Sequence, residues 1–137
     1  DVPAIVGLIR ELADFEKLAH LVQVTPQGLH PHLFGERPVA ESVVAEVGGR
    51  VVGFALFFTN FSTFLGKPGL YLEDLYVAPT VRGGGTGKLL IEWVQRYAQY
   101  HGCARLYWHT QQTNKRGQEL DDWIAEDSGC VEYRMAL

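Results

Sequence analysis

The stretch YVAPTVRGGGTGKLLIEW, from Tyr76 to Trp93, constrains the fold of this chain more than any other. Its glycines lie between an apolar run and a segment whose apolar residues have helical spacing. A helix that begins at a glycine cluster leaves backbone N–H groups unpaired at its positive end, which is typical of an anion-binding site. The stretch therefore predicts a strand, an anion-binding loop and a helix in succession.

Two common phosphate-binding patterns do not fit this loop. The nucleoside-triphosphate loop GxxxxGK[ST] requires glycine at Arg82 and serine or threonine at Leu89. The dinucleotide pattern GxGxxG matches at Gly85 and Gly87 but meets Leu90 at its third glycine. The pattern that fits is RxxGxG, and a nucleotide-binding domain is therefore disfavoured.

Hydrophobic periodicity predicts helices and strands that mix along the whole chain. The first helix is expected to begin at Asp1, with Pro3 in its first turn, and a second to begin at Thr25. Further along we expect strands over 42–47 and 51–58 joined at Gly48-Gly49, a strand over 70–77, a helix from the glycines to Gly102, a strand over 104–110, a helix over 114–126 and a closing strand over 130–137. This order predicts one α/β domain over residues 1–137.

Composition and charge narrow the class of protein. A chain of 137 residues with 47% hydrophobic residues can bury one core, and a net charge of -4 argues against a nucleic-acid partner. The longest apolar run, over 51–58, is too short to cross a bilayer, and no secretory-signal pattern opens the chain. We therefore expect a cytoplasmic protein with no membrane partner. Cys103 and Cys130 form no CxxC pair, and we expect neither a disulfide framework nor a metal site.

The sequence resembles the GCN5-related N-acetyltransferase superfamily, whose R/Q-x-x-G-x-G/A loop binds the pyrophosphate of acetyl-CoA. The segments ELADFE, FGERP, VAEV, VGFALFF, YLEDLYV and RGGGTG are similar to its diamine branch, the spermidine/spermine and thialysine acetyltransferases. The resemblance covers nearly the whole chain. It implies a mixed central sheet flanked by helices, with the superfamily's first strand missing because this chain begins at the helix that follows it. It also implies acetyl-CoA as co-substrate, a small amine acceptor, no metal and a homodimer.

The resemblance places the cofactor along one strand and the glycine loop. In the superfamily, backbone groups matching Leu75, Tyr76 and Val77 bond the pantetheine arm and the acetyl carbonyl. The loop amides that bond the pyrophosphate match Arg82, Gly83, Gly84, Gly85, Thr86, Gly87 and Lys88. The Arg82 and Lys88 side chains either add charge there or are ordinary solvated basic residues. Asn114 matches a pantetheine-binding position and is also a good helix N-cap.

Two carboxylates, Glu73 and Asp74, interrupt the apolar strand just before the glycine loop. A purely structural strand rarely contains two adjacent acids, although a solvated strand end or an ion pair with Arg82 would also explain them. In the diamine branch the glutamate matching Glu73 is the base that deprotonates the amine through water, and the aspartate matching Asp74 contacts the substrate. Alternation directs neighbouring side chains to opposite faces, so both acids can line one pocket only if the strand is bulged there.

One position departs from the pattern of the diamine branch. Where its members have a tyrosine acid near the CoA sulfur, this chain has Asp121. An ordinary aspartate is ionised at neutral pH and cannot donate a proton. Either this carboxyl holds its proton unusually tightly, or another group protonates the sulfur, or catalysis is weakened; alternatively Asp121 is simply exposed on its helix.

The sequence therefore predicts direct acetyl transfer from acetyl-CoA to a primary amine of a small molecule, with Glu73 and Asp121 as catalytic candidates. A non-catalytic acyl-CoA-binding or sensor domain is the alternative, because the tyrosine acid is missing. The distal acids of the spermidine/spermine enzymes are also missing, since Ala19-His20 and the segment 61–64 lie at those places. We therefore expect a short diamine or a thialysine-like amino acid to be acetylated better than spermine.

Overall fold

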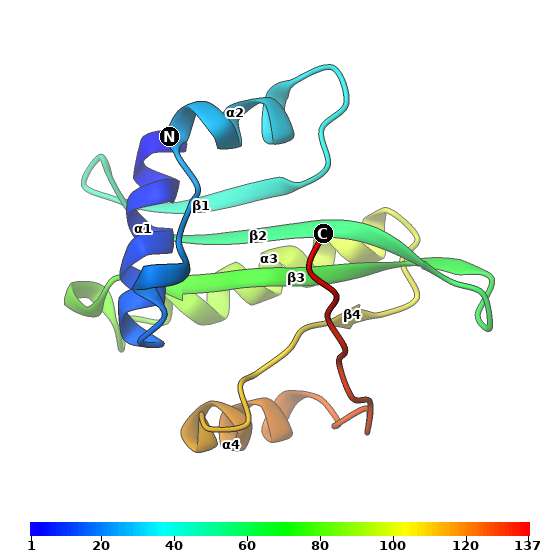
Figure 1. Ribbon diagram of the computed structural model, residues 1–137. Coiled ribbons are helices and arrows are strands. Elements are labelled where there is room, and N and C mark those ends of the chain that lie inside the picture. Colours follow the sequence, from blue (N-terminus) through cyan, green and yellow to red (C-terminus); the bar gives the residue numbers. More distant parts are fainter.

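The computed structural model describes residues 1–137 as a four-stranded sheet with helices on both faces (Figure 1). The elements are α1 (Val2–Phe15), a 3-10 helix (Ala19–Leu21), α2 (Pro26–Phe34), β1 (Glu41–Val47), β2 (Arg50–Ser62), β3 (Lys67–Val77), a second 3-10 helix (Pro79–Val81), α3 (Thr86–Tyr100), β4 (Leu106–Tyr107) and α4 (Lys115–Ile124). This arrangement confirms the predicted α/β class. None of the helices combines the length and apolar character needed to span a membrane.

The sheet is mixed, with strand order β1-β2-β3-β4. The first two pairs are antiparallel, whereas β3 and β4 are parallel and pair only at Leu70–Leu106 and Tyr71–Tyr107. The β1–β2 turn uses Gly48 and Gly49 at φ of 59° and 80°, because a two-residue hairpin turn of type I′ needs positive φ at both positions. The predicted hairpin and mixed sheet are therefore both present.

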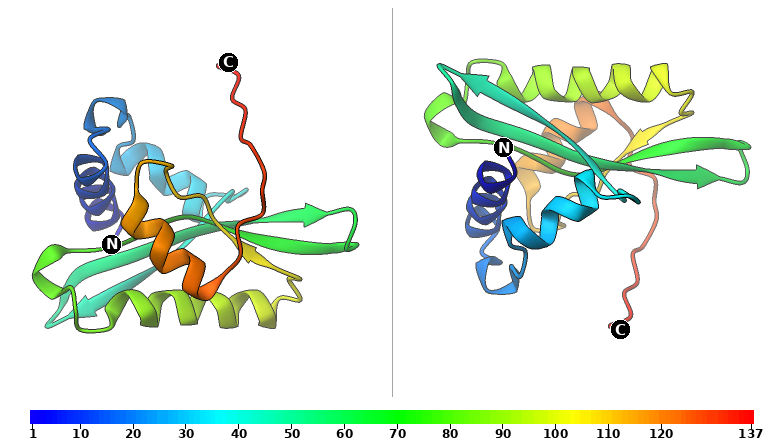
Figure 2. Two further views of the ribbon diagram at one scale, coloured as in Figure 1. Left: turned by 90° about the horizontal axis from the view of Figure 1, so that it is seen from below. Right: turned by 90° about the horizontal axis from the view of Figure 1, so that it is seen from above.

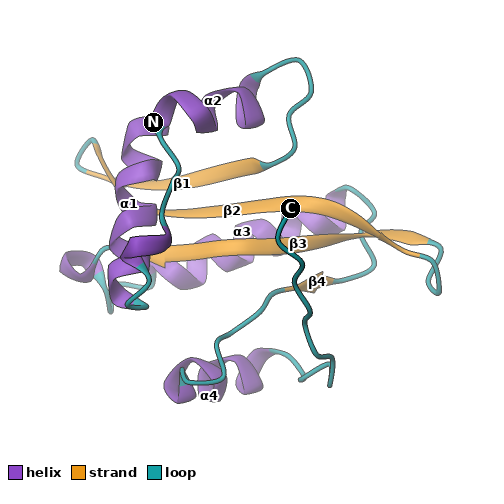
Figure 3. Cartoon of the chain, in the orientation of Figure 1, coloured by secondary structure: helices purple, strands orange, loops and turns teal.

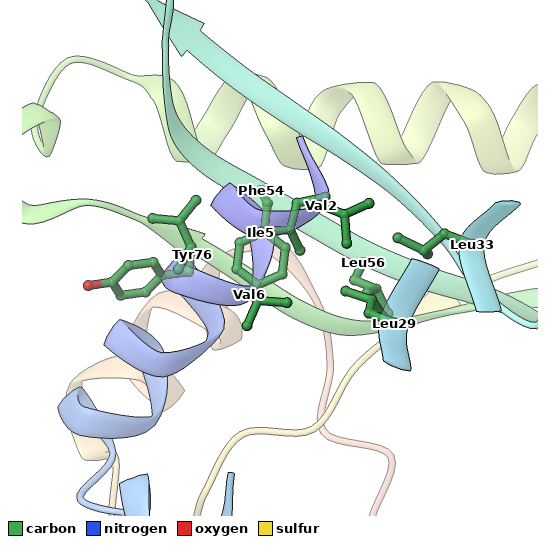
Figure 4. Close-up of a cluster of buried hydrophobic side chains, with 9 residues drawn as sticks. Val2, Ile5, Val6, Leu29, Leu33, Phe54, Leu56 and Tyr76 are labelled. Atoms are coloured by element: carbon green, nitrogen blue, oxygen red, sulfur yellow. The ribbon is translucent and has the colours of Figure 1, made fainter. Parts of the chain in front are cut away.

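Each face of the sheet carries its own hydrophobic core. α1 and α2 cover one face and α3 covers the other (Figure 2). The first core contains Val2, Ile5, Val6, Leu8, Leu29, Leu33, Phe54, Leu56 and Tyr76 (Figure 4). The second contains Ala55, Phe57, Leu70, Leu72, Val94 and Ala98. Because β2 contributes to both cores, its apolar run is continuous rather than alternating.

Local chemistry sets several of the helix ends. Asp1 is the N-cap residue of α1, although its side chain makes no capping hydrogen bond. Thr25 Oγ1 accepts the Gly28 N–H at 3.0 Å and caps α2. Gly102, at φ of 73°, follows the end of α3 as predicted. These caps explain why the sequence located the helices well.

The sequence prediction was wrong or incomplete in three places. The strand expected over 104–110 contains only Leu106–Tyr107, and the helix expected over 114–126 spans Lys115–Ile124. The segment over 130–137, which was expected as a closing strand, pairs with no strand and therefore belongs to no sheet (Figure 3). On α3, Leu90, Val94 and Ala98 make the contact with the sheet, whereas Leu89 and Trp93 are exposed.

Candidate active site

The sheet opens beside the glycine loop. β3 and β4 separate after the pair Tyr71–Tyr107, so β3 beyond this point has β2 on one side and no strand on the other. An open strand edge presents backbone donors and acceptors that can pair with an extended, amide-containing ligand. This opening lies between the end of β3 and α4, which lies below β4 in Figure 1.

The glycine loop presents a row of free backbone donors. The N–H groups from Gly83 to Lys88 donate no hydrogen bond within the chain, and no side chain caps the start of α3. Gly83 and Gly85 have φ of 87° and 82°, which L side chains rarely adopt, and a Cβ at either would meet no protein atom within 4 Å. The loop therefore has the geometry of an anion cradle, with open space in front of it.

The Arg82 side chain turns away from this cradle. Its Nε donates to the Val77 carbonyl at 2.9 Å, and its guanidinium lies 5.4 Å from the Phe15 ring centroid and 5.3 Å from that of Tyr76. The Lys88 Nζ lies 3.9 Å from a Glu92 carboxylate oxygen on the surface of α3. Arg82 thus fastens the end of α1 to the end of β3, a contact that sequence spacing alone did not indicate.

β3 has the bulge that a shared carboxylate site requires. Leu56 pairs with Asp74 and the next β2 residue, Phe57, pairs with Leu72, so Glu73 is the extra residue. Asp74 shares the α1 face of the sheet with the buried Tyr76, while Glu73 is exposed at the bulge. The structure thus brings both acids to the edge where β3 loses its second neighbour.

The carboxylate pair has no cation of its own. Neither Glu73 nor Asp74 forms an ion pair with Arg82, which excludes that explanation for the two acids. Burial, followed by the nearby charges of Glu73 and then Glu16, raises the pKa of Asp74 to about 6. Burial also raises the pKa of Glu16. A bound ammonium group would relieve this repulsion, so the site is suited to a cationic ligand.

Tyr71 lies on the same face, at the last pair before the opening. Its hydroxyl is 2.8 Å from His109 Nδ1. Burial raises the pKa of Tyr71 to about 12, with Glu73, Glu132, Tyr107 and Asp74 contributing to the shift in that order, so its hydroxyl stays protonated at neutral pH. The sequence did not identify Tyr71 or Glu132. For Tyr71, the sequence offered only its position on a strand in which a bulge was considered. For Glu132, the sequence offered no indication of a place in the site.

Asn114 and Asp121 tie α4 to its surroundings. Asn114 Oδ1 accepts the Gly117 N–H at 2.9 Å, which confirms the helix N-cap. Asp121 accepts a hydrogen bond from the Thr110 hydroxyl, so it is partly buried rather than simply exposed. The bond joins the end of the β4 segment to α4. No group of three or more His, Cys, Asp or Glu side chains is arranged to hold a metal ion.

Comparison with known proteins identifies the family to which the chain belongs. The model of the acetyltransferase (GNAT) family matches residues 9–120. The chain is 35% identical to thialysine N-ε-acetyltransferase of Mus musculus, over 98% of this chain and 86% of the relative. It is 30% identical to L-ornithine N5-acetyltransferase of Arabidopsis thaliana, over 79% of this chain and 67% of the relative. An integron cassette protein from the V. cholerae mobile metagenome has a TM-score of 0.79 and 25% identity, over 97% of this chain and 85% of that one.

The chain therefore belongs to the acetyltransferase (GNAT) family. It is an acetyl-CoA-dependent N-acetyltransferase, as the sequence predicted, and a non-catalytic sensor domain is not favoured. The roles of the individual residues remain predictions.

Proposed function

We propose that this chain transfers the acetyl group of acetyl-CoA directly to a primary amine of a short diamine or a thialysine-like amino acid. The observation that carries this proposal is the bulged Glu73–Asp74 pair at the place where the edge of β3 opens. The names of the relatives, which act on thialysine and L-ornithine, support an acceptor of this size and charge.

The proposed donor site combines the glycine loop with the open edge. The free N–H groups from Gly83 to Lys88 take the pyrophosphate, because backbone donors at a helix N-terminus suit a doubly charged anion. Backbone groups of Leu75, Tyr76 and Val77 pair with the amides of the pantetheine arm. Asn114 can serve both of its predicted roles, since its Oδ1 caps α4 and its amide N–H groups remain available for pantetheine.

The proposed chemistry needs one base. Asp74 holds the ammonium form of the acceptor, and Glu73 accepts its proton through a water molecule. The free amine nitrogen then bonds to the thioester carbonyl carbon while the carbon–sulfur bond breaks and the electron pair leaves with the sulfur. An ordinary thiol has a pKa of about 8.5, so the thiolate leaves readily. The nitrogen loses its second proton as it becomes the amide, and this proton passes through water to the thiolate, which gives the CoA thiol. Asp121, as the acceptor of the Thr110 hydroxyl, positions α4 rather than donating a proton.

The proposed setting is a cytoplasmic homodimer that uses no metal ion. This part of the proposal rests on the resemblance to the diamine branch and on the composition of the chain. Size-exclusion chromatography with light scattering measures the oligomeric state, and activity after dialysis against a chelator tests the metal.

The experiment that tests the function is release of the CoA thiol from acetyl-CoA by the purified chain with a panel of amines. Thialysine, ornithine, 1,3-diaminopropane and spermine cover the acceptor classes. We expect the short amines to have the higher kcat/KM, with Glu73→Gln strongly impaired and the exposed Glu46→Gln on β1 as the matched control. CoA binding without turnover of any amine, or spermine above every short amine, would contradict the proposal.

A further inference from the structure

A connected group of four side chains lies beside the proposed acceptor site and has no part in the chemistry above. It consists of Tyr71, His109, Glu132 and Arg134. His109 Nδ1 lies 2.8 Å from the Tyr71 hydroxyl and 3.3 Å from Glu132 Oε1, and Arg134 Nε lies 2.9 Å from Glu132 Oε2. These contacts run from β3 outward to the C-terminal segment, which lies on the α1 side of the sheet in both views of Figure 2.

Arg134 has unused hydrogen-bonding capacity. Only its Nε contacts a protein atom, and its side chain is 85% exposed, so the two terminal nitrogens of the guanidinium have no partner in the chain. A guanidinium presents its donors as a planar fork that matches both oxygens of a carboxylate. Glu132 is 46% exposed, and each of its oxygens retains a free lone pair that can accept from an ammonium group.

The group is continuous with the carboxylate pair. Tyr71 lies on the face that carries Asp74, and its hydroxyl is joined to Glu132 through His109 Nδ1, 2.8 Å from the hydroxyl and 3.3 Å from Glu132 Oε1. The charges of Glu73, Asp74 and Glu132 also contribute to the raised pKa of Tyr71. The Tyr71 and Tyr107 rings pack edge to face at 5.2 Å and supply an apolar surface between the charged groups. The charges therefore follow one order along this surface: acids at the bulge, aromatic rings, the acid Glu132, and the cation Arg134.

An amino acid with an amine at the end of its side chain carries the complementary order of charges. Its terminal ammonium faces the bulge, its aliphatic middle lies on the rings, and its α-ammonium and α-carboxylate come last. A simple diamine has the same two cations but offers nothing to Arg134. The order of charges therefore distinguishes two acceptors that the carboxylate pair alone does not.

We propose that Arg134 binds the α-carboxylate of an amino-acid acceptor and that Glu132 holds its α-ammonium, so the C-terminal segment selects amino acids over diamines. This inference rests on the proposed function and narrows its acceptor class. It assigns substrate specificity to a segment that contributes nothing to the sheet.

The test compares two acceptors that differ in one group. Thialysine and bis(2-aminoethyl) sulfide share the same chain and two amines, but only thialysine has the carboxylate. With saturating acetyl-CoA, we expect Arg134→Gln to raise the KM for thialysine by about tenfold or more, with kcat nearly unchanged. The KM for the sulfide diamine should change far less, and Glu132→Gln should weaken both acceptors because both offer an ammonium there.

Arg96→Gln on the exposed surface of α3 is the matched control, since it removes a guanidinium on the opposite face of the sheet. An Arg134→Gln variant that leaves both KM values unchanged, or shifts them equally, overturns the inference while the proposed function stands. A wild-type chain that acetylates neither acceptor overturns the proposed function, and the inference with it. Wild-type preference for thialysine that disappears in Arg134→Gln supports both.

Discussion

Replacing Asp74 by asparagine measures how much the ionised Asp74 carboxylate lowers the free energy of unfolding of the chain. Burial, with Glu73 and Glu16 contributing, raises the pKa of Asp74 from 3.8 to about 6. A difference of about two pKa units corresponds to about 3 kcal/mol between the charged and neutral forms. The folded chain therefore binds the Asp74 proton more tightly than the unfolded chain does, and ionising this carboxyl destabilises the fold.

The sign of the pH dependence follows. Because the folded pKa is raised, the native state loses stability as pH rises from about 4 to about 6 and does not regain it above that range. An asparagine side chain cannot ionise, so Asp74→Asn should be more stable than the wild type by up to about 3 kcal/mol at about pH 8, and the difference should vanish below about pH 4. The variant should also bind the cationic acceptor more weakly, because the charge that destabilises the fold is the one proposed to hold the ammonium.

Urea unfolding followed by circular dichroism, at both pH values, gives the free energies of unfolding. Asp122→Asn on the exposed surface of α4 is the matched control and should leave stability unchanged. A variant at Asp74 that is no more stable than the wild type at about pH 8, or whose advantage is the same at about pH 4, would refute the reasoning.

Three further variants test the donor site, the base and Asp121. Gly85→Val places a β-branched residue at φ of 82° in the anion cradle and should weaken CoA binding at least tenfold, about 1.4 kcal/mol, by calorimetry; unchanged affinity in a folded variant argues against the cradle. Glu73→Gln should lower kcat/KM roughly a hundredfold with CoA affinity intact, and wild-type rates would reduce Glu73 to a structural residue. Asp121→Asn keeps an acceptor for Thr110, so kcat should fall less than about threefold, whereas a hundredfold loss would show that Asp121 transfers a proton.

The parts of the fold that the sequence predicted well are those set by neighbouring residues. The Gly48-Gly49 hairpin, the caps at Thr25 and Asn114 and the glycine loop before α3 each depend on the conformation or hydrogen bonding of a few consecutive residues. The closing strand failed for the opposite reason. The alternating pattern of Val131, Tyr133, Met135 and Leu137 is typical of a strand, but pairing depends on an available strand edge elsewhere in the fold, which periodicity does not encode.

The residues of the candidate site also fall into two groups, those indicated by neighbouring residues and those that depend on contacts between distant parts of the chain. The sequence indicated Glu73 and Asp74 because two acids interrupt an apolar strand. Because side chains alternate between the two faces of a strand, the sequence also predicted that these acids could share a site only at a bulge, which β3 has. The contacts of Glu132 with His109 and of Arg134 with Glu132 could not be predicted, because the first of them depends on the course of the C-terminal segment. The contact of Arg82 with Phe15 was also hidden, since it joins the end of α1 to the loop after β3.

A crystal structure of the chain with CoA tests the central claim most directly, namely that the glycine loop and the open edge of β3 form the acetyl-CoA site. We predict pyrophosphate oxygens within hydrogen-bond distance of the N–H groups between Gly83 and Lys88, and the pantetheine arm paired with Leu75–Val77. The thiol should end at the opening beside Glu73. CoA bound elsewhere, with these backbone groups left free, would contradict the account.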